Sequence, residues 1–411
     1  MSRLRKFLTI VLAVLLLSQI PFAYRRYRLG RLNAVIQSLN SERVSPEKTG
    51  AAEAFREYKG VIHVHSFLGG HSTGTFQEII AGAKANQLDF VIMTEHVEGN
   101  FDTSALTLSG IHDDVLFVNG NEVETPTGNR LLSIPGDASL SVPPKLTTDE
   151  VSDNSHSRNA LAIITYPENL TGSAERADGI EIYNVFTNAR RINRLVAFFD
   201  ALWSHYSYPD LLFTNYLQRP DESLAKWDQM LAKKRLVATA GNDSHSNIGL
   251  TLNDSSGNKL LGFKFDPYET SFHLVRMHVL IPTSEFPHGM RMPLDTPRLM
   301  NALRGGHCYL GFDLLSDTTG FRFEAVNTNN RGIQGDEIPL RSETKLQVFS
   351  PLRCRLLIFK DGKIISEQTD VSTMEIKVDS RGIYRVEAYL PQLGEPAGKQ
   401  PWIISNPIYV R

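Results

Sequence analysis

The sequence of 411 residues contains only two cysteines, Cys308 and Cys354, and they do not form a C-x-x-C pair. This scarcity argues against a thiolate zinc site and against a disulfide scaffold, although one bridge between the two residues stays open. The chain also lacks an excess of either charge, because its net charge is −2 and its acidic and basic residues are interspersed. With no basic stripe of interleaved aromatic residues, nucleic acid is not expected as a partner.

One long apolar run occurs, over residues 7–24 near the N-terminus. Basic residues flank it on both sides: Arg3, Arg5 and Lys6 precede it, and Arg25, Arg26, Arg28 and Arg31 follow it. A run of about 18 residues is at the short limit for a membrane span, and no small-x-small cleavage site precedes the arginines. Residues 1–31 are therefore predicted to be an uncleaved signal anchor, which makes the membrane a partner. Similarity to short-tailed signal anchors places the globular part outside the cytoplasm.

The rest of the chain divides into three segments by its pattern. Residues 32–57 are polar and helix-prone and are predicted to form a stalk or an entry helix. From residue 58 to 310, short apolar runs alternate with helical stretches such as 75–86, 188–204 and 221–234. This alternation predicts an α/β fold, a parallel sheet of about seven units that closes or nearly closes into a barrel, with its chemistry at the carboxyl ends of the strands. Residues 311–411 show short alternating segments and turn signals, which predict a small all-β sandwich.

Histidines and carboxylates follow several of the apolar runs directly. His63 and His65 end the first run, and their period of two places both imidazoles on one face of a strand. The same position after other runs is taken by His96, Glu122, Asp243 and His245, and His71 lies in a glycine-rich loop. Because the ends of such strands converge, these seven residues are predicted to bind metal ions. Imidazole with carboxylate suits zinc, manganese or iron better than calcium or magnesium.

In sequence order, the motifs resemble those of the PHP (polymerase and histidinol phosphatase) metal-dependent hydrolases. The matching motifs are the run from His63 to His71, Thr94-Glu95-His96, Gly120-x-Glu122, Gly179 to Asn184, and Gly241 to His245. The resemblance implies a distorted seven-stranded barrel, with one ion held by His63, His65, Glu122 and Asp243 and another by His71, His96 and His245. The segments 301–306 and 402–410 also resemble the branch with carbaryl-type ester hydrolases, in which a sandwich follows the barrel.

Two positions depart from the family pattern. Arg130 and Tyr166 stand where members usually carry histidines that bind a middle ion. Because a guanidinium cannot be a metal ligand and repels cations, one or two ions are predicted instead of three. Arg130 is a candidate for binding an anionic substrate group, and Tyr166 for donating to an oxyanion. Glu95 and Glu181 are not expected to bind the metal themselves but to orient the ligand side chains through hydrogen bonds, with Glu95 orienting His96.

The predicted function is hydrolysis of an ester by metal-activated water, with His63, Asp243, Arg130 and Tyr166 as the catalytic candidates. Phosphate esters are the first choice for a small-molecule substrate, because the family acts on them most often. A carboxylic or carbamate ester is the alternative that the C-terminal resemblance favours. A non-catalytic, metal-dependent binding module of the cell envelope is the alternative from another class, which the two missing histidines favour.

Overall fold

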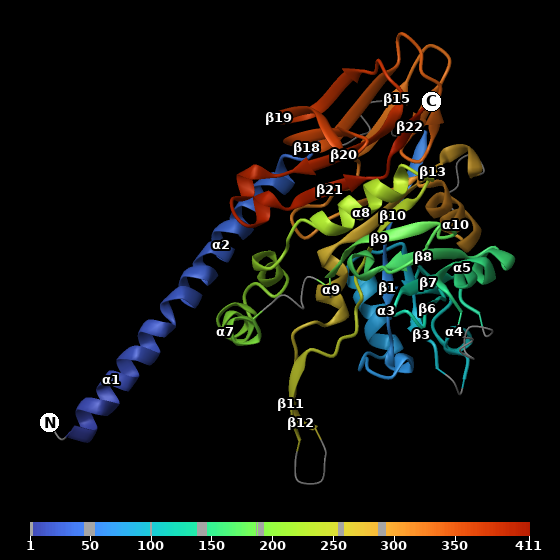
Figure 1. The fold of residues 1–411 in the computed structure, drawn as a ribbon. Coiled ribbons are helices and arrows are strands. Elements are labelled where there is room, and N and C mark those ends of the chain that lie inside the picture. The colour runs from blue at the N-terminus through green and yellow to red at the C-terminus, as the bar shows by residue number, and fades with distance from the viewer. Residues whose placement is uncertain are drawn as a thin grey trace.

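The computed structural model describes residues 3–44, 54–98, 101–137, 146–185, 187, 193–253, 259–286 and 293–411. Residues 45–53 of the predicted stalk and residues 188–192 of a predicted helix lie outside these ranges. The fold is mixed α/β, with a helical N-terminus, large sheets and a β-rich C-terminal region (Figure 1). The α/β prediction is thereby confirmed at this level, whereas the closed barrel and the anchor stay predictions.

The N-terminus forms two consecutive helices, α1 (Arg3–Ser18) and α2 (Ile20–Ser41). No residue of α1 is buried, and α1 projects away from the body (Figure 1). In contrast, α2 buries Leu29, Leu32, Ile36 and Leu39, and it runs through the predicted boundary between residues 31 and 32. Residues 3–41 are long and apolar enough to cross a membrane, by length and composition.

The larger of the sheets contains fourteen strands of the described chain, and it runs from the N-terminal half into the C-terminal region. In its central part, β13 and β1 are antiparallel, whereas β1, β2 and β5 are parallel. The first strands are β1 (Phe55–Val64), β2 (Phe90–Met93), β4 (Gly110–His112), β5 (Val115–Val118), β13 (Arg276–Pro282) and β14 (Cys308–Gly311). The C-terminal strands are β15 (Arg322–Val326), β16 (Arg331–Ile333), β17 (Glu337–Ile338), β18 (Lys345–Lys360), β19 (Lys363–Lys377), β20 (Gly382–Tyr389), β21 (Pro401–Ser405) and β22 (Ile408–Val410).

A second sheet contains six of the described strands, in the order β10-β9-β8-β7-β6-β3. They are β3 (Glu95–His96), β6 (Asn121–Glu124), β7 (Arg130–Ile134), β8 (Leu161–Thr165), β9 (Gly179–Asn184) and β10 (Val237–Gly241). The prediction of a parallel sheet is wrong at β13, which is antiparallel to β1, and also at β7, an additional strand that is antiparallel to both β6 and β8. At β7 the reason is a tight turn between β6 and β7, in which Thr125 N donates to Asn129 O at 2.8 Å, because a turn this short joins only antiparallel strands.

Backbone hydrogen bonds join the two sheets beyond the end of β10. Asn242 N donates to Ile62 O at 2.9 Å, and Ser244 N donates to His63 O at 3.2 Å. On the other side of β1, Thr94 N donates to Val64 O at 2.8 Å, and Thr94 alone separates β2 from β3. The carboxyl ends of β1, β2 and β10 therefore meet at one seam.

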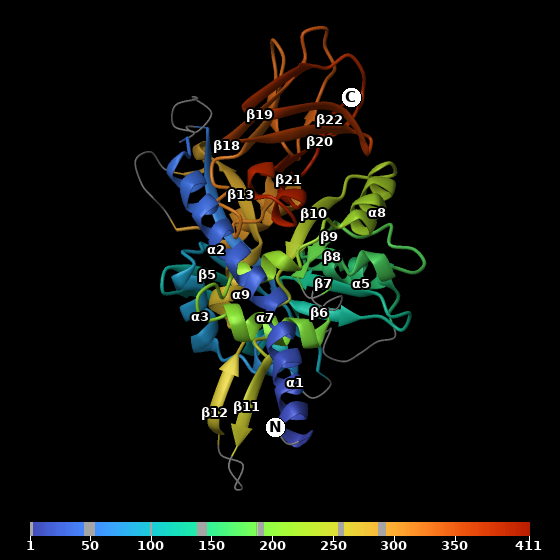
Figure 2. The same cartoon turned by 90° about the vertical axis from the view of Figure 1, so that its left-hand side faces the viewer.

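Helices cover the sheets, and a third, two-stranded sheet extends from the body. The described helices beyond α2 are α3 (Phe76–Ala85), α4 (Thr103–Leu106), α5 (Thr148–Ser157), α7 (Arg194–Ser204), α8 (Asp221–Leu231), α9 (Tyr268–Leu274) and α10 (Thr296–Gly305). Capping boxes start α3 at Thr75 and α5 at Thr147, as their Thr-x-x-Glu sequences favour. The hairpin of β11 (Gly249–Asn253) and β12 (Lys259–Lys264) projects from the same side as α1 in both views (Figures 1 and 2).

A buried charge network connects β1, β13 and the segment after β14. His278 Nδ1 lies 2.9 Å from Glu57 Oε1, and its Nε2 lies 3.3 Å from Asp313 Oδ1. Arg322 donates to Glu57 at 2.6 Å, and Arg276 donates to Asp313 at 3.2 Å. Burial disfavours the imidazolium, but the charge of Asp313 and the hydrogen bonds to Asp313 and Glu57 raise the pKa of His278 to about 9. These side chains had no role in the sequence predictions.

We expect the network to make the protein less stable at alkaline pH. Because the folded pKa of His278, about 9, exceeds the ordinary 6.5, its stabilising contribution is complete below pH 6.5 and is lost as the pH rises through 9. Denaturant unfolding measured between pH 6.5 and 9.5 should show this decline, and the His278→Gln variant should show a flatter profile. Identical profiles for the two proteins would contradict the assignment.

The two cysteines are free and buried, so the bridge that the sequence left open does not form. Burial raises the pKa of both Cys308 and Cys354 to about 12, which leaves them as neutral thiols in the core.

Candidate metal centre

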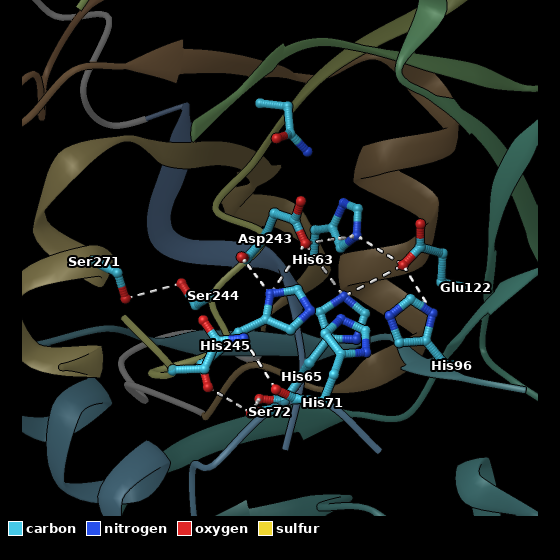
Figure 3. A network of polar contacts seen from close by, with 12 residues as sticks. His63, His65, His71, Ser72, His96, Glu122, Asp243, Ser244, His245 and Ser271 are labelled. Carbon is cyan, nitrogen blue, oxygen red and sulfur yellow. Dashed lines mark hydrogen bonds and ion pairs between the residues drawn. The ribbon is translucent and has the colours of Figure 1, made fainter. Parts of the chain in front are cut away.

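The predicted ligands meet at the seam between the two sheets (Figure 3). His63 lies in β1, and His65 follows its last residue. His96 lies in β3 and Glu122 in β6, and these residues are register partners. Asp243 and His245 follow β10. Of these side chains only that of His96 is more than slightly exposed, at 20%.

Three residues of the site have a left-handed backbone, which is uncommon for side chains other than glycine. The φ angles are 69° at His63, 50° at Tyr166 and 49° at Asp243. At His63 the pairing register of β1 with β2 also shifts. Such a conformation is costly and persists where the surroundings impose it, as they often do at functional sites.

Four side-chain atoms converge where the resemblance implies the first ion. Glu122 Oε2 lies 3.4 Å from His63 Nε2 and 3.5 Å from His65 Nε2. Asp243 Oδ1 lies at the same distances, 3.4 Å and 3.5 Å, from these two nitrogens. Ligands bound tetrahedrally at about 2.0–2.2 Å would lie about 3.3–3.6 Å from one another. The four nitrogen–oxygen distances therefore have the spacing of one coordination shell.

These same atoms are buried and have no hydrogen-bond partner among the described residues. A buried polar atom without a partner costs free energy, and here two nitrogens and two carboxylate oxygens share that cost at one point. A divalent cation bound among His63, His65, Glu122 and Asp243 would satisfy all four. The donor set thus fits a metal ion by its chemistry as well as by its spacing.

A second group of potential ligands adjoins the first. One nitrogen each of His65, His96 and His245 lie within 4.8 Å of one another. Glu122 Oε2 is 3.3 Å from His96 Nδ1, so this oxygen faces both groups. The exposed His71 has its ring centroid 4.6 Å from that of His96 and 4.5 Å from that of His245. The structure therefore brings together all three histidines of the implied second ion, and adds His65 to them.

The charge of Glu122 holds the cluster together electrostatically. Burial opposes its ionisation, but the close contact with His63 at 3.4 Å and the charges of His63, His65 and His96 lower the pKa of Glu122 to about 2. Burial also lowers the pKa of His96 to about 4, against the attraction of Glu122. An ionised carboxylate beside a neutral imidazole is the pair of protonation states that metal ligands require.

Glu181 lies behind His63, where the sequence placed a supporting residue. Its Oε2 is 2.8 Å from His63 Nδ1, and its Oε1 accepts from Thr165 at 2.8 Å and from Asn184 at 2.7 Å. This contact leaves Nε2 of His63 facing the cluster. The glycine at 241 is required here, because a Cβ at that position would lie 1.9 Å from Glu181 Oε2.

We expect Glu181→Gln to weaken metal binding by about 10- to 100-fold, because carboxylates that orient a ligand histidine contribute about that much. Isothermal titration with zinc or manganese measures the change directly. Glu168→Gln is a matched control, because Glu168 accepts from Thr187 and has no contact with His63 among the described interactions. Equal affinities in all three proteins would show that Glu181 does not support the site.

Tyr166 and Arg130 bind the outer oxygens of the two carboxylates. Tyr166 donates its hydroxyl to Asp243 Oδ2 at 2.6 Å, and burial together with the charge of Asp243 raises the pKa of Tyr166 far above its usual range. Arg130 donates to Glu122 Oε1 at 3.3 Å and to Glu124 at 3.0 Å. Both side chains thus leave one oxygen of each carboxylate facing the cluster.

Glu95 is fully buried, but its hydrogen bonds differ from the expected contact with His96. It accepts from Ser66 N at 3.0 Å and from Thr107 at 2.8 Å. Burial raises its pKa against these hydrogen bonds. Glu95 therefore holds the backbone next to His65, at the start of the loop that leads to His71.

No protein-family model matches the chain, and neither does any curated protein. The chain is similar to a two-domain protein from Bacteroides vulgatus that contains a predicted PHP-like metal-dependent phosphoesterase. The match covers 86% of this chain and 95% of the Bacteroides chain, at 12% identity and a TM-score of 0.38.

Two further solved structures are similar at 12% identity. PsfC from Pseudomonas syringae covers 61% of this chain and 90% of its own, with a TM-score of 0.37. A proposed metal-dependent phosphoesterase from Bifidobacterium adolescentis covers 46% and 88%, with a TM-score of 0.31. These similarities are distant, so the case for the chemistry of this chain rests on its own site. The resemblance to carbaryl-type ester hydrolases stays a prediction.

Sequence reasoning missed the residues that fix the loop after β10. Ser72 donates to His245 O at 2.6 Å, and Thr73 N donates to the same oxygen at 3.3 Å. Tyr268, from α9, donates to His65 O at 2.5 Å. The only available signal was the position of Ser72 directly after His71, because Tyr268 is remote from every motif in sequence.

Proposed function

We propose that the chain is a metal-dependent hydrolase that acts on phosphate esters. The observation that carries the proposal is the convergence of four buried, unpartnered ligand atoms from His63, His65, Glu122 and Asp243 at 3.4–3.5 Å from one another across the nitrogen–oxygen pairs. A divalent ion held there would supply an activated water and polarise the ester. Imidazole and carboxylate ligands suit zinc, manganese or iron.

The number of ions that we propose is one or two. The first group has a complete set of four ligands, and His71, His96, His245 and His65 offer nitrogens for a second ion next to Glu122. Arg130 and Tyr166 contact the outer carboxylate oxygens, which a third ion would need. A fixed guanidinium next to that position opposes another cation.

A phosphate ester is favoured as the substrate because the positively charged side chain of Arg130 borders the candidate metal centre. A cavity of about 220 Å³ is lined by Arg130, Tyr166, Asn129 and Leu170, among others. The side chain of Arg130 is partly exposed, at 32%, although its guanidinium also pairs with Glu122 and Glu124. Guanidinium groups bind phosphate oxygens well, so Arg130 can hold the substrate while Tyr166 and Glu181 hold the ligands in place.

We further propose that the N-terminal helices anchor the protein in a membrane, with the globular part on the extracytoplasmic side. Support for an anchor comes from the exposed apolar surface of α1 and from the length of residues 3–41. For the main body, we propose that the seam between the two sheets closes a distorted PHP-type barrel, which residues 311–411 follow as a sandwich. The backbone bonds between β1 and the segment after β10 support the closure.

The proposal is tested on the full chain in detergent, loaded with zinc, manganese or iron. We expect stoichiometric metal and hydrolysis of a chromogenic phosphate mono- or diester. His63→Ala should abolish both, and His112→Ala should preserve both, because His112 lies in β4 and its Nε2 pairs with Ser109 O. Turnover only of carboxylic or carbamate esters would favour the alternative hydrolase. Bound metal without turnover of any ester would favour a binding module.

A further inference from the structure

Helix α7 presents an apolar stripe to solvent. Leu195, Phe198 and Leu202 are 67%, 43% and 69% exposed, and their spacing of three and four residues places them on one face of the helix. Tyr206, just beyond the helix, is 98% exposed. A contiguous apolar stripe of this kind on a helix indicates a surface that another apolar phase covers.

Side-chain contacts hold helix α7, and with it the apolar stripe, next to the end of the apolar N-terminal run. The contacts that join α7 to this end include Arg25 with Asp200 at 2.9 Å, Trp203 with Gln19 at 3.0 Å, and the rings of Phe22 and Phe199 at 5.1 Å. Gln19 and Phe22 lie where the apolar run ends and the arginines begin. If α1 crosses a bilayer, α7 lies at the level of the lipid headgroups.

The residues around this junction have the composition of a membrane interface. Tyr24 and Tyr27 are about equally exposed, at 60% and 59%. Four arginines lie within the same two turns of α2: Arg25, Arg26 and Arg28 bind Asp200, Trp203 O and Glu395 O within the protein, and Arg31 is exposed. Aromatic rings favour the interface between lipid and water, and arginines complement anionic headgroups. These features favour a lipid surface over a protein as the occupant of the stripe.

The same side of the body leads to the candidate metal centre. After α7, Asp210 contacts His273 of α9 at 2.8 Å, and the ring of His205 lies 5.8 Å from that of Phe265. Asp266 then accepts from Ile248 N at 2.9 Å, three residues beyond His245. In both views, α1 and the hairpin β11–β12, which starts at Gly249, extend from one side of the body (Figures 1 and 2).

We infer that α7 rests on the bilayer and that the substrate is the phosphate ester of a membrane lipid headgroup. The choice of substrate rests on the proposed phosphoesterase function, whereas the docking of α7 does not. Exposed Ile248, at 47%, lies between the loop of His245 and the hairpin and adds an apolar side chain at this edge. On this inference, the lipid headgroup enters the centre from the surface on which α7 lies.

Fluorescence tests the docking of α7 on the bilayer, and this test does not depend on enzymatic activity. The full chain is reconstituted in nanodiscs of phosphatidylcholine with brominated acyl chains, as Leu195→Trp and as the control Ile364→Trp. Both positions are exposed, at 67% and 52%, but Ile364 lies in β19 of the C-terminal region. We expect brominated lipid to quench the added emission of Leu195→Trp alone. Equal emission in brominated and ordinary lipid would overturn the docking.

The substrate is tested in nanodiscs that contain phosphatidic acid as a monoester and phosphatidylglycerol as a diester. Replacing Leu195 and Leu202 by Asn should lower the rate on one of these lipids by about tenfold, because two apolar contacts with the bilayer are lost. The rate on a soluble chromogenic ester should not change, and the pair Ile364→Asn and Ile365→Asn should change neither rate.

The results of these experiments distinguish the lipid substrate from the proposed phosphoesterase function. Hydrolysis of the soluble ester but of neither lipid would overturn the lipid substrate and leave the phosphoesterase function intact. Equal lipid rates in the α7 variant and the unmodified protein would also overturn it. Hydrolysis of no ester by metal-loaded protein would overturn the proposed function and the lipid substrate with it, and the fluorescence result would still decide the docking.

Discussion

Asp243→Asn should remove the metal from the first group of ligands and lower the rate of ester hydrolysis by about a thousandfold, which is about 4 kcal/mol in the activation barrier. The reason is that Asp243 Oδ1 contacts both His63 Nε2 and His65 Nε2, so its charge acts on the centre of the cluster. Asparagine keeps the size of the side chain and an oxygen for the hydroxyl of Tyr166. The variant therefore removes charge with little change in packing.

Metal content and turnover are measured together on the purified full chain. Asp149→Asn is the control, because Asp149 accepts from Ser173 and from Arg176 N, outside the cluster. Circular dichroism shows whether Asp243→Asn keeps its fold. Full activity in a folded Asp243→Asn protein would place the reaction elsewhere in the molecule.

Asp313→Ala should destabilise the fold by about 3–5 kcal/mol, the usual cost of removing one partner from a buried ion pair. Asp313 is almost fully buried and lies between Arg276 and His278, so its loss leaves two buried cations without this carboxylate. It also accepts from Thr318 at 2.7 Å, which fixes the turn after β14.

The free energy of unfolding in urea measures this effect. Asp370→Ala is the matched control, because Asp370 pairs with Arg353 on the surface and is 74% exposed. We expect a much smaller change there, since exposed pairs are screened by solvent. If the two variants lost the same stability, the buried network would not be a main support of the fold.

The sequence identified side chains that the structure brings together, because their pattern is local. A histidine pair with a period of two, as at His63 and His65, places both rings on one face wherever the strand goes. Parallel strands then bring Asp243 to the same end from far along the chain. Neither step requires knowledge of side-chain packing.

What the sequence did not predict depends on packing between distant segments. The sequence did not predict that Tyr166, the candidate oxyanion donor, has a left-handed backbone and donates its hydroxyl to Asp243. Glu95 bonds Ser66 and Thr107 rather than His96. The ion pairs of His278 join residues up to 221 positions apart, so no spacing rule identifies them.

The larger sheet continues through the predicted domain boundary at residue 310. This continuity protects the chain from aggregation. β14 pairs with β13 on one side and with β21 on the other, so it presents no open row of backbone groups at this boundary. Unpaired strand edges recruit strands of other molecules. The last strands of the chain thus act as a cap for the sheet that carries β1, and a protein without them would expose a ready template for pairing with its own copies.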